Sequence, residues 1–158
     1  MIIKPFESNH LEDIVQLSLK AWRPVFDSLK NALKEDVYEE LYPNGWELSQ
    51  KEAVEAACES SKYRVRVTSY PDVIAGFIAV THHKEKLGEI FMIALDPDYQ
   101  RKGIATHLTN FAINWMKKSG MTIVMVETGA DPGHYPARKT YEKLGFNMIP
   151  ISRYYQKI

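Results

Sequence analysis

Apolar residues along this chain follow two different spacings, which predict a fold that mixes helices and strands. Residues 11–21 and 104–116 repeat apolar positions every three or four residues, as on one face of a helix. In residues 63–69, apolar and polar residues alternate instead. Val65 and Val67 fall on one face and Arg64 and Arg66 on the other, as in a half-buried strand. Residues 90–95 are apolar without a break, which predicts a strand buried on both faces.

The remaining segments complete this mixed pattern. Further strands are expected at 1–4, 74–82 and 121–128, and a closing hairpin at 147–149 with 154–157. Further helices are expected at 22–33, 37–41, 49–60 and 136–144, with Pro24 breaking the first long helical region. The order predicts an α/β (α+β) fold, in which a mixed sheet is flanked by helices on both faces. The length suits a single domain over residues 1–158.

The most informative segment joins the strand at 90–95 to the helix that begins at residue 104. Asp96-Pro97 ends the strand, because proline has no N–H for a sheet ladder. Gly103 allows the backbone to approach a ligand closely, and Arg101 and Lys102 add positive charge beside it. The first N–H groups of a helix lack partners and favour anions. The segment therefore predicts a site for a phosphate-bearing cofactor.

The hexapeptide Gln100-Arg101-Lys102-Gly103-Ile104-Ala105 resembles the acetyl-CoA pyrophosphate loop of the GNAT superfamily of N-acyltransferases. A second segment, Tyr141-Glu142-Lys143-Leu144-Gly145-Phe146, resembles that family's last helix. The resemblance covers roughly residues 60 to 150. It implies a GNAT-type fold, with a mixed, mostly antiparallel central sheet flanked by helices on both faces. It also implies direct transfer of an acetyl group from acetyl-CoA to a primary amine of a small molecule or peptide. It also implies a set of cofactor-binding residues: Ile93, Ala94, Leu95, Gln100, Arg101, Lys102, Gly103, Ile104, Ala105, Thr106, His134 and Ala137.

The resemblance also implies the catalytic groups. Tyr141 stands where the family keeps a tyrosine, and a phenol can give a proton to the departing thiolate; a purely structural aromatic is the alternative. Glu89 is the candidate base at the start of the cofactor strand, with Glu127 in reserve, although Glu89 could instead face solvent or pair with Arg64. Backbone N–H groups of Ile93, Ala94 and Leu95 would hold the acetyl carbonyl.

His134 departs from the pattern, because the family often has asparagine three residues before the alanine that is Ala137 here. The usual contact of that asparagine with the pantetheine arm is therefore in doubt. A histidine could still hydrogen-bond the cofactor or carry a proton near neutral pH, and a surface-loop histidine is the alternative.

The acceptor is not specified by the sequence. Aromatic residues between positions 22 and 46 either line an amine pocket by cation–π attraction or pack the helices; they are Trp22, Phe26, Tyr38, Tyr42 and Trp46. A non-catalytic acetyl-CoA sensor of the same fold is the rival function. A nucleotide binder is disfavoured because the glycine patterns of nucleotide loops are missing.

Composition limits the partners. The net charge is +0, so no overall field attracts nucleic acid or an anionic membrane, and a homodimer is left open. The single Cys58 excludes an internal disulfide and suits a reducing cytoplasm, and no metal site is expected from the histidine spacing. In its helix, Cys58 is expected to be a packing residue rather than a nucleophile.

Overall fold

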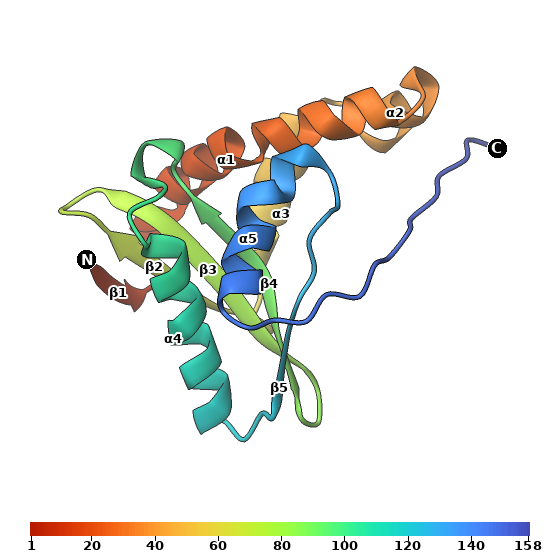
Figure 1. The fold of residues 1–158 in the computed structure, drawn as a ribbon. Coiled ribbons are helices and arrows are strands. Elements are labelled where there is room, and N and C mark those ends of the chain that lie inside the picture. The colour runs from red at the N-terminus through yellow and green to blue at the C-terminus, as the bar shows by residue number, and fades with distance from the viewer.

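The computed structural model describes residues 1–158 and contains a twisted sheet with helices on both faces (Figure 1). The helices are α1 (Leu11–Ala32), α2 (Glu35–Leu41), α3 (Trp46–Glu59), α4 (Ile104–Lys118) and α5 (Tyr135–Lys143). The strands are β1 (Ile2–Pro5), β2 (Arg64–Ser69), β3 (Ile74–Lys84), β4 (Leu87–Leu95) and β5 (Ile123–Val126). Short 3-10 turns lie at Ser8–His10 (η1), Pro97–Tyr99 (η2) and Pro132–His134 (η3).

The strands lie side by side in chain order, β1-β2-β3-β4-β5. The first three pairings are antiparallel, and only β4 and β5 run parallel, with α4 as the crossover between them. The predicted mixed, mostly antiparallel sheet is therefore confirmed. None of the helices combines the length and the apolar character that crossing a membrane requires.

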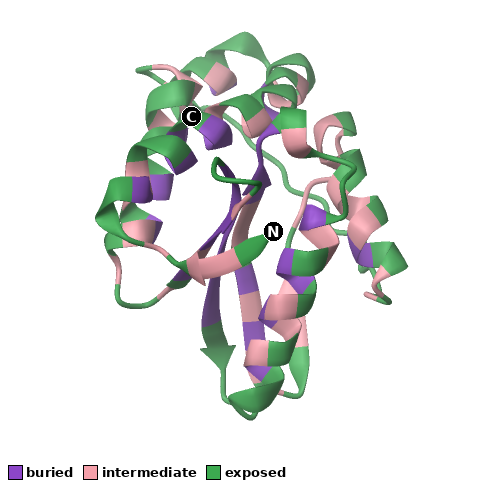
Figure 2. Ribbon diagram, turned by 90° about the vertical axis from the view of Figure 1, so that its left-hand side faces the viewer, coloured by how far each residue is buried: buried purple, intermediate pink, exposed green.

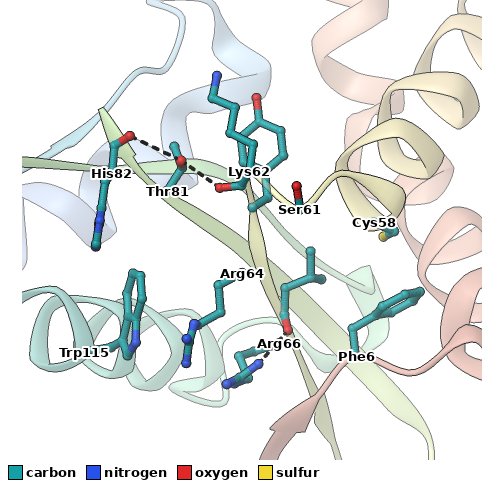
Figure 3. Close-up of a pocket in the computed structure, with 11 residues that line it drawn as sticks. Phe6, Cys58, Ser61, Lys62, Arg64, Arg66, Thr81, His82 and Trp115 are labelled. Carbon is teal, nitrogen blue, oxygen red and sulfur yellow. Dashed lines mark hydrogen bonds between the residues drawn. The ribbon is translucent and has the colours of Figure 1, made fainter. Parts of the chain in front are cut away.

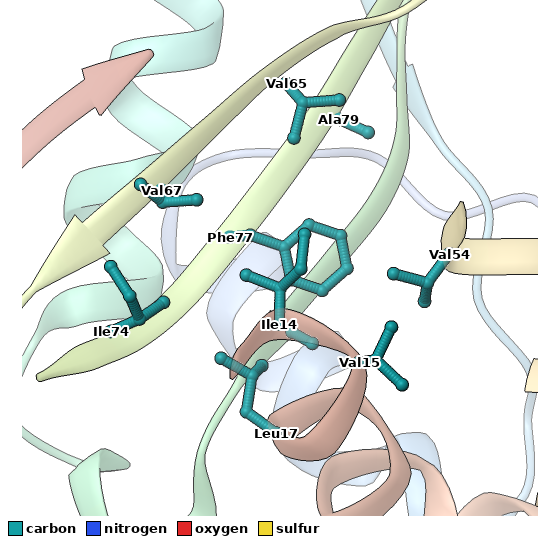
Figure 4. Close-up of a cluster of buried hydrophobic side chains, with 10 residues drawn as sticks. Ile14, Val15, Leu17, Val54, Val65, Val67, Ile74, Phe77 and Ala79 are labelled. Carbon is teal, nitrogen blue, oxygen red and sulfur yellow. The ribbon is translucent and has the colours of Figure 1, made fainter. Parts of the chain in front are cut away.

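Two apolar cores lie on opposite faces of the sheet, as expected for side chains that alternate along strands. On one face, Ile14, Val15 and Leu17 of α1 and Val54 of α3 pack on Val65, Val67, Ile74, Phe77 and Ala79 (Figure 4). On the other face, α4 packs Ile104, Leu108, Ala112 and Met116 on Ala75, Ile78, Val80 and Ile90. Figure 2 shows the buried residues on the inner faces of the helices and along the middle strands. The alternation at 63–69 thus places Val65 and Val67 in the core, as predicted.

The expected helix break at Pro24 is wrong, because α1 continues through it to Ala32. Proline lacks the N–H for one helical bond, which costs stability. Buried side chains on both sides of Pro24, including Leu17 and Phe26, hold the helix in one piece against the rest of the protein. Tertiary packing therefore overrides the local signal.

The closing hairpin expected at 147–149 and 154–157 is also wrong, because residues 146–158 form no regular element. This tail leaves the end of α5 and runs outward to the side of the molecule where α2 lies (Figure 1). Its Met148, Ile149 and Ile151 are exposed by 70% or more. Apolar residues form strands only where a neighbour pairs with them. Here ion pairs join the tail's Arg153 to Glu127 and its Lys157 to Glu40 instead.

Two predicted strands are less buried than expected. The strand expected at 121–128 shortens to Ile123–Val126 and is half-exposed, because β5 is an edge strand with β4 as its one neighbour. In β4 most residues are covered, but Phe91 is 42% exposed. The prediction that both faces of residues 90–95 are buried is therefore wrong at Phe91, and the cause is an opening in the sheet at this point.

Candidate active site

The sheet opens where β4 and β5 separate. Their parallel pairing covers Leu87–Ile90 with Ile123–Val126 and ends there, while β4 continues to Leu95. The pairing of β4 with β3 skips a residue at the same place, because Met92 pairs with Ala79 but Ile90 pairs with Val80. Phe91 is therefore the extra residue of a β-bulge, which bends a strand away from its neighbour. Beyond the bulge, the N–H groups of β4 that face away from β3 have no ladder partner.

A cavity of about 490 Å³ fills this opening and reaches both faces of the sheet. That size is typical of small-molecule sites, which measure about 300 to 1,000 Å³. Its lining includes Trp22 and Val25 of α1, the β4 segment from Ile90 to Leu95, and the end of β5 at Val126 to Thr128. Of the predicted cofactor residues, it includes Ile93, Ala94, Leu95, Gln100, Arg101, Gly103, Ile104, Ala105, Thr106, His134 and Ala137. The structure thus brings together nearly all the residues that the sequence predicted.

The glycine turn before α4 offers unpaired backbone donors to this cavity. Gly103 has φ +79 and Arg101 has φ +59, so two residues of the turn are left-handed. The first α-helical hydrogen bond runs from the N–H of His107 to the carbonyl of Gly103. The N–H groups from Gly103 to Thr106 therefore remain without helical acceptors. Such a helix start, beside the guanidinium of Arg101, favours a bound anion.

Lys102 is the exception among the predicted cofactor residues, because it does not line the cavity. Its ammonium lies 4.8 Å from the ring centroid of Tyr99 and 5.4 Å from that of Tyr70. Cation–π attraction accounts for this position on the outer side of the turn. Its charge can still add to the local potential, but its side chain points elsewhere.

An ion pair fixes the start of this turn on α1. The Lys20 Nζ and Asp96 Oδ2 atoms are 2.9 Å apart, and the backbone N–H of Asp98 donates to Asp96 Oδ1 at 3.0 Å. Burial alone would raise the pKa of Asp96, but these hydrogen bonds and the Lys20 charge bring it below its usual value. The carboxylate therefore stays ionised and holds the end of β4 against α1.

Tyr141 lies in the cavity wall on α5 and is 7% exposed. Burial raises the pKa of its phenol to about 12. The hydroxyl therefore keeps its proton throughout the neutral range. Its ring also contacts Phe146, at 5.7 Å between centroids, so Tyr141 has a packing role as well as a position in the cavity.

The structure separates the two candidate bases. Glu89 lies outside the cavity, where its Oε2 is 3.1 Å from Nδ1 of His83, so the alternative pairing with Arg64 is not formed. Glu127 lines the cavity directly after β5, and its Oε1 is 2.9 Å from a guanidinium nitrogen of Arg153. Both partners of that pair are more than half exposed, so the attraction is weak. Glu127 and Tyr141 thus share the cavity, whereas Glu89 does not.

The loop that carries His134 is held by its own side chains. His134 Nδ1 lies 2.6 Å from Asp131 Oδ2, and its backbone N–H donates to the Oδ1 atom of the same carboxylate at 3.1 Å. Burial alone would raise the pKa of Asp131, but its hydrogen bonds and the charge of His134 lower the pKa below its usual value. An ionised carboxylate only accepts, so Nδ1 carries the proton and Nε2 is the ring nitrogen open to a ligand.

Close packing against α1 fixes the position of the same loop. A Cβ added to Gly133 would lie 2.6 Å from the backbone nitrogen of Val25, so no side chain fits there. Arg138 donates to the carbonyls of Gly129 and Asp131, which closes the loop over the start of α5. His134 therefore has a fixed place in the cavity wall rather than the mobile setting of a surface-loop histidine.

Two threonines line the cavity and were missed by sequence reasoning. The hydroxyls of Thr109 on α4 and Thr128 after β5 are fully buried without a hydrogen-bond partner. Buried hydroxyls are normally paired, so both are candidates to bond a ligand. Thr109 could have been found, because it falls on the apolar face of its helix with Ala105, Leu108 and Ala112.

The aromatic residues proposed for the acceptor mostly pack against one another. The Phe26 ring stacks on Trp46 at 4.6 Å and meets Tyr42 edge-on at 5.3 Å between centroids, and Tyr38 meets Tyr42 at 5.0 Å. Of the five aromatics, Trp22 lines the cavity. Helix packing is therefore the correct interpretation of the other four.

Cys58 lies outside this cavity, on α3, and lines a different one. Burial raises the pKa of its thiol to about 11, and the charges of Glu59 and Glu55 act in the same direction. The thiol is therefore protonated at neutral pH and far from the Gly103 turn. It has neither the position nor the ionisation of a nucleophile.

Comparison with protein families gives a match to the Acetyltransferase (GNAT) family over residues 27–146. Among curated proteins, the chain is 39% identical over 66 residues to ribosomal protein bS18-alanine N-acetyltransferase of Escherichia coli, covering 42% of this chain and 43% of that protein. It is 29% identical over 83 residues to mycothiol acetyltransferase of Thermomonospora curvata, covering 52% of this chain and 27% of that protein. The matched region thus spans less than half of these relatives.

Solved structures share the fold over nearly the whole chain. The PaiA N-acetyltransferase of Thermoplasma acidophilum, solved with coenzyme A, superposes with a TM-score of 0.72 at 16% identity, over 96% of this chain and 92% of that one. The Escherichia coli ribosomal-protein-S18-alanine N-acetyltransferase gives a TM-score of 0.68 at 21% identity, over 94% of this chain and 79% of that one. At these identities the likeness establishes the fold.

Proposed function

Because the chain belongs to the GNAT family of acetyltransferases, we propose that it transfers an acetyl group from acetyl-CoA directly to a primary amine. The amine belongs to a small molecule or a peptide. The observation that carries this proposal is the single cavity that joins the Gly103 turn, the unpaired edge of β4, Glu127 and Tyr141.

The cofactor half of the cavity is suited to acetyl-CoA. The free N–H groups at the start of α4 and the Arg101 guanidinium bind the pyrophosphate. The unpaired N–H groups of β4, at Ile93 to Leu95, hold the pantetheine arm and the acetyl carbonyl. The hydroxyls of Thr109 and Thr128, together with His134 Nε2, offer further polar contacts where the family often has an asparagine.

The catalytic half supplies a base and an acid. Glu127 takes a proton from the acceptor's ammonium group, directly or through a water molecule, which leaves the neutral amine free to attack; it replaces Glu89 in this role because it shares the cavity with Tyr141. Backbone N–H groups of β4 stabilise the negative oxygen as the amine attacks the thioester carbonyl. Tyr141, protonated because burial raises its pKa to about 12, gives its proton to the departing thiolate.

The acceptor enters from the face of the sheet on which α1 lies, beside Trp22 and Val25. The relatives are named for mycothiol and for an alanine of ribosomal protein bS18, so family membership allows both small-molecule and peptide amines. The reducing cytoplasm remains the proposed compartment, in which the single thiol of Cys58 would stay free.

The test has two steps. First, acetyl-CoA, ATP and NAD are compared by thermal unfolding; acetyl-CoA should raise the melting temperature with concentration, and ATP and NAD should not. Second, a panel of primary amines and amino-terminal peptides is screened for release of free CoA. Binding without acetylation of any amine would favour the rival sensor function, and the absence of acetyl-CoA binding would overturn both.

A further inference from the structure

A second cavity, of about 620 Å³, lies away from the acetyl-CoA cavity and is rich in positive charge. It is lined by β2, the end of β3 and the last turn of α4, with Lys62, Arg64, Arg66 and Trp115 around it (Figure 3). No Asp or Glu is among its lining residues. The chain has 20 acidic and 20 basic residues, so this one-sided charge does not follow from composition.

The arginines of this cavity lack acidic partners. Lys62, Arg64 and Arg66 take part in none of the ion pairs within 4.0 Å, although Lys20, Arg153 and Lys157 do elsewhere. Arg64 and Arg66 are two residues apart on β2, so their side chains leave the same face of the sheet about 7 Å apart. Figure 3 shows both side chains extending from the strand toward α4. Burial lowers the pKa of Arg66, and the nearby positive charge of Arg64 lowers it further, so the two guanidinium groups are close enough to repel each other.

Two aromatic rings of the cavity, Trp115 and Tyr63, pack against other side chains. The Arg64 guanidinium lies 4.7 Å from the Trp115 ring centroid, and the His82 ring stacks on Trp115 at 5.4 Å. Tyr63 stacks on Phe91 at 4.3 Å. These contacts hold Arg64 in place and occupy the rings of Trp115 and Tyr63. The cavity therefore recognises its ligand through charge and hydrogen bonds rather than through stacking.

We propose that this cavity is a binding site for a phosphate group, either free or as the monoester of a small molecule, held between Arg64 and Arg66. Two guanidinium groups match the oxygens of a phosphate, and its double negative charge relieves their mutual repulsion. Lys62 also lines the cavity, but its ammonium lies over the Tyr63 ring, 5.1 Å from the centroid, and extends away from the two arginines (Figure 3). The site is separate from the acetyl-CoA turn, because Trp115 and Ile104 are about 16 Å apart along α4 at 1.5 Å per residue.

Titration followed by NMR tests the proposal with CoA present in excess, so that any phosphate site at the Gly103 turn is filled. The probes are inorganic phosphate and glycerol phosphate, and the signals are the arginine Nε–H groups and the Trp115 indole N–H. Saturable shifts of Arg64, Arg66 and Trp115 are expected. Tighter binding of glycerol phosphate would assign a phosphorylated small molecule, and equal or tighter binding of inorganic phosphate would assign the free ion.

Substitutions distinguish specific phosphate binding by these arginines from non-specific attraction of anions to positive charge. Arg64→Gln and Arg66→Gln should each weaken phosphate binding about 10- to 100-fold, the range expected for loss of a charged hydrogen bond. Arg66→Lys keeps the charge but loses the planar fork, so it should weaken binding less. The matched control is Arg23→Gln, because Arg23 also lies over an indole, 5.7 Å from the Trp46 ring centroid, but outside this cavity. The control should bind phosphate like the unmodified protein.

The acetyl-CoA-dependent rise in melting temperature checks that the variants fold, since neither arginine contacts that cavity. Unsaturable shifts, or equal binding by the Arg64→Gln and Arg23→Gln variants, would overturn the proposal. A single-stranded oligonucleotide that binds the same arginines more tightly than either probe would overturn the small-ligand assignment.

Discussion

Replacing Tyr141 by phenylalanine removes one hydroxyl and isolates its proposed role as the acid. The residue is 7% exposed, and burial is the one cause that raises the pKa of the phenol to about 12. No hydrogen bond within the protein contributes to that shift, so the hydroxyl has no partner to lose. Tyr141→Phe should therefore change the free energy of unfolding by less than about 0.5 kcal/mol.

The effect on turnover should be large. A positioned general acid contributes about 10²- to 10⁴-fold, which corresponds to about 2.7 to 5.4 kcal/mol of barrier. Because the proton is given up only as the thioester breaks, kcat should fall while the dissociation constant of acetyl-CoA stays within about twofold. The assay combines free-CoA release in the steady state with single-turnover measurements, which show whether chemistry limits the rate.

The pH dependence gives a second check on the same variant. With its pKa near 12 in the folded protein, Tyr141 stays protonated up to pH 10, so the loss of kcat should be equally large at pH 7 and pH 9. The unfolded phenol ionises at a lower pH than the folded one. The unmodified protein should therefore lose stability relative to the variant as the pH rises from about 10 toward 12.

Tyr135→Phe is the matched control, because Tyr135 begins the same helix but is 54% exposed and lies outside the cavity. It should keep the unmodified kcat. A kcat for Tyr141→Phe within threefold of the unmodified enzyme, with chemistry limiting in both, would refute the assignment of Tyr141 as the acid.

Four further substitutions test other parts of the site. Gly103→Val should abolish the acetyl-CoA-dependent rise in melting temperature and cost about 1 to 2 kcal/mol of stability in urea, because φ is +79 there; a folded variant that still responds would contradict the pyrophosphate site. Glu127→Gln should lower kcat/KM at pH 7 by at least about tenfold and Glu89→Gln by less than about twofold, and the reverse result would return the base to Glu89. Cys58→Ala should keep full activity, because burial keeps the thiol protonated; radiolabelled acetyl on Cys58 that passes to an amine would overturn direct transfer.

The residues that line the proposed cofactor half of the cavity could be predicted from the sequence because backbone geometry brings them together. Gly103, the apolar strand before it and the helical spacing after it all lie between residues 90 and 116, so local pattern and turn chemistry are sufficient. The structure adds the bulge at Phe91, which has no marker residue such as glycine in β4 beyond Gly88. A bulge depends on how two strands align, and alternation within one strand does not encode that alignment.

The choice between the two glutamates could not be predicted, because it depends on where pairing stops. Glu89 lies within the paired part of β4, opposite Met125, so its side chain is carried toward the β3–β4 turn and His83. Glu127 lies just beyond the last pair, Ile90 with Val126, where the strands separate and the cavity begins. From the sequence both appear as a glutamate at one end of an apolar strand. The register of a parallel pair, set by packing around α4, decides which one lines the cavity.

The acceptor half of the cavity is formed by side chains, whereas the proposed cofactor half depends on backbone N–H groups, so amine specificity should depend on those side chains. Its wall combines Trp22 and Val25 of α1, Glu127 after β5 and Lys139 of α5, so side chains from distant segments form it. The tail reaches the same region through the pair between Arg153 and Glu127. Because backbone N–H groups are proposed to hold the cofactor, substitutions at Trp22 or in the tail should alter which amine enters without disturbing the turn at Gly103. Acceptor preference and acetyl-CoA affinity should therefore vary independently among variants of this chain, since no acceptor-side residue supplies the helix start that is proposed to hold the pyrophosphate.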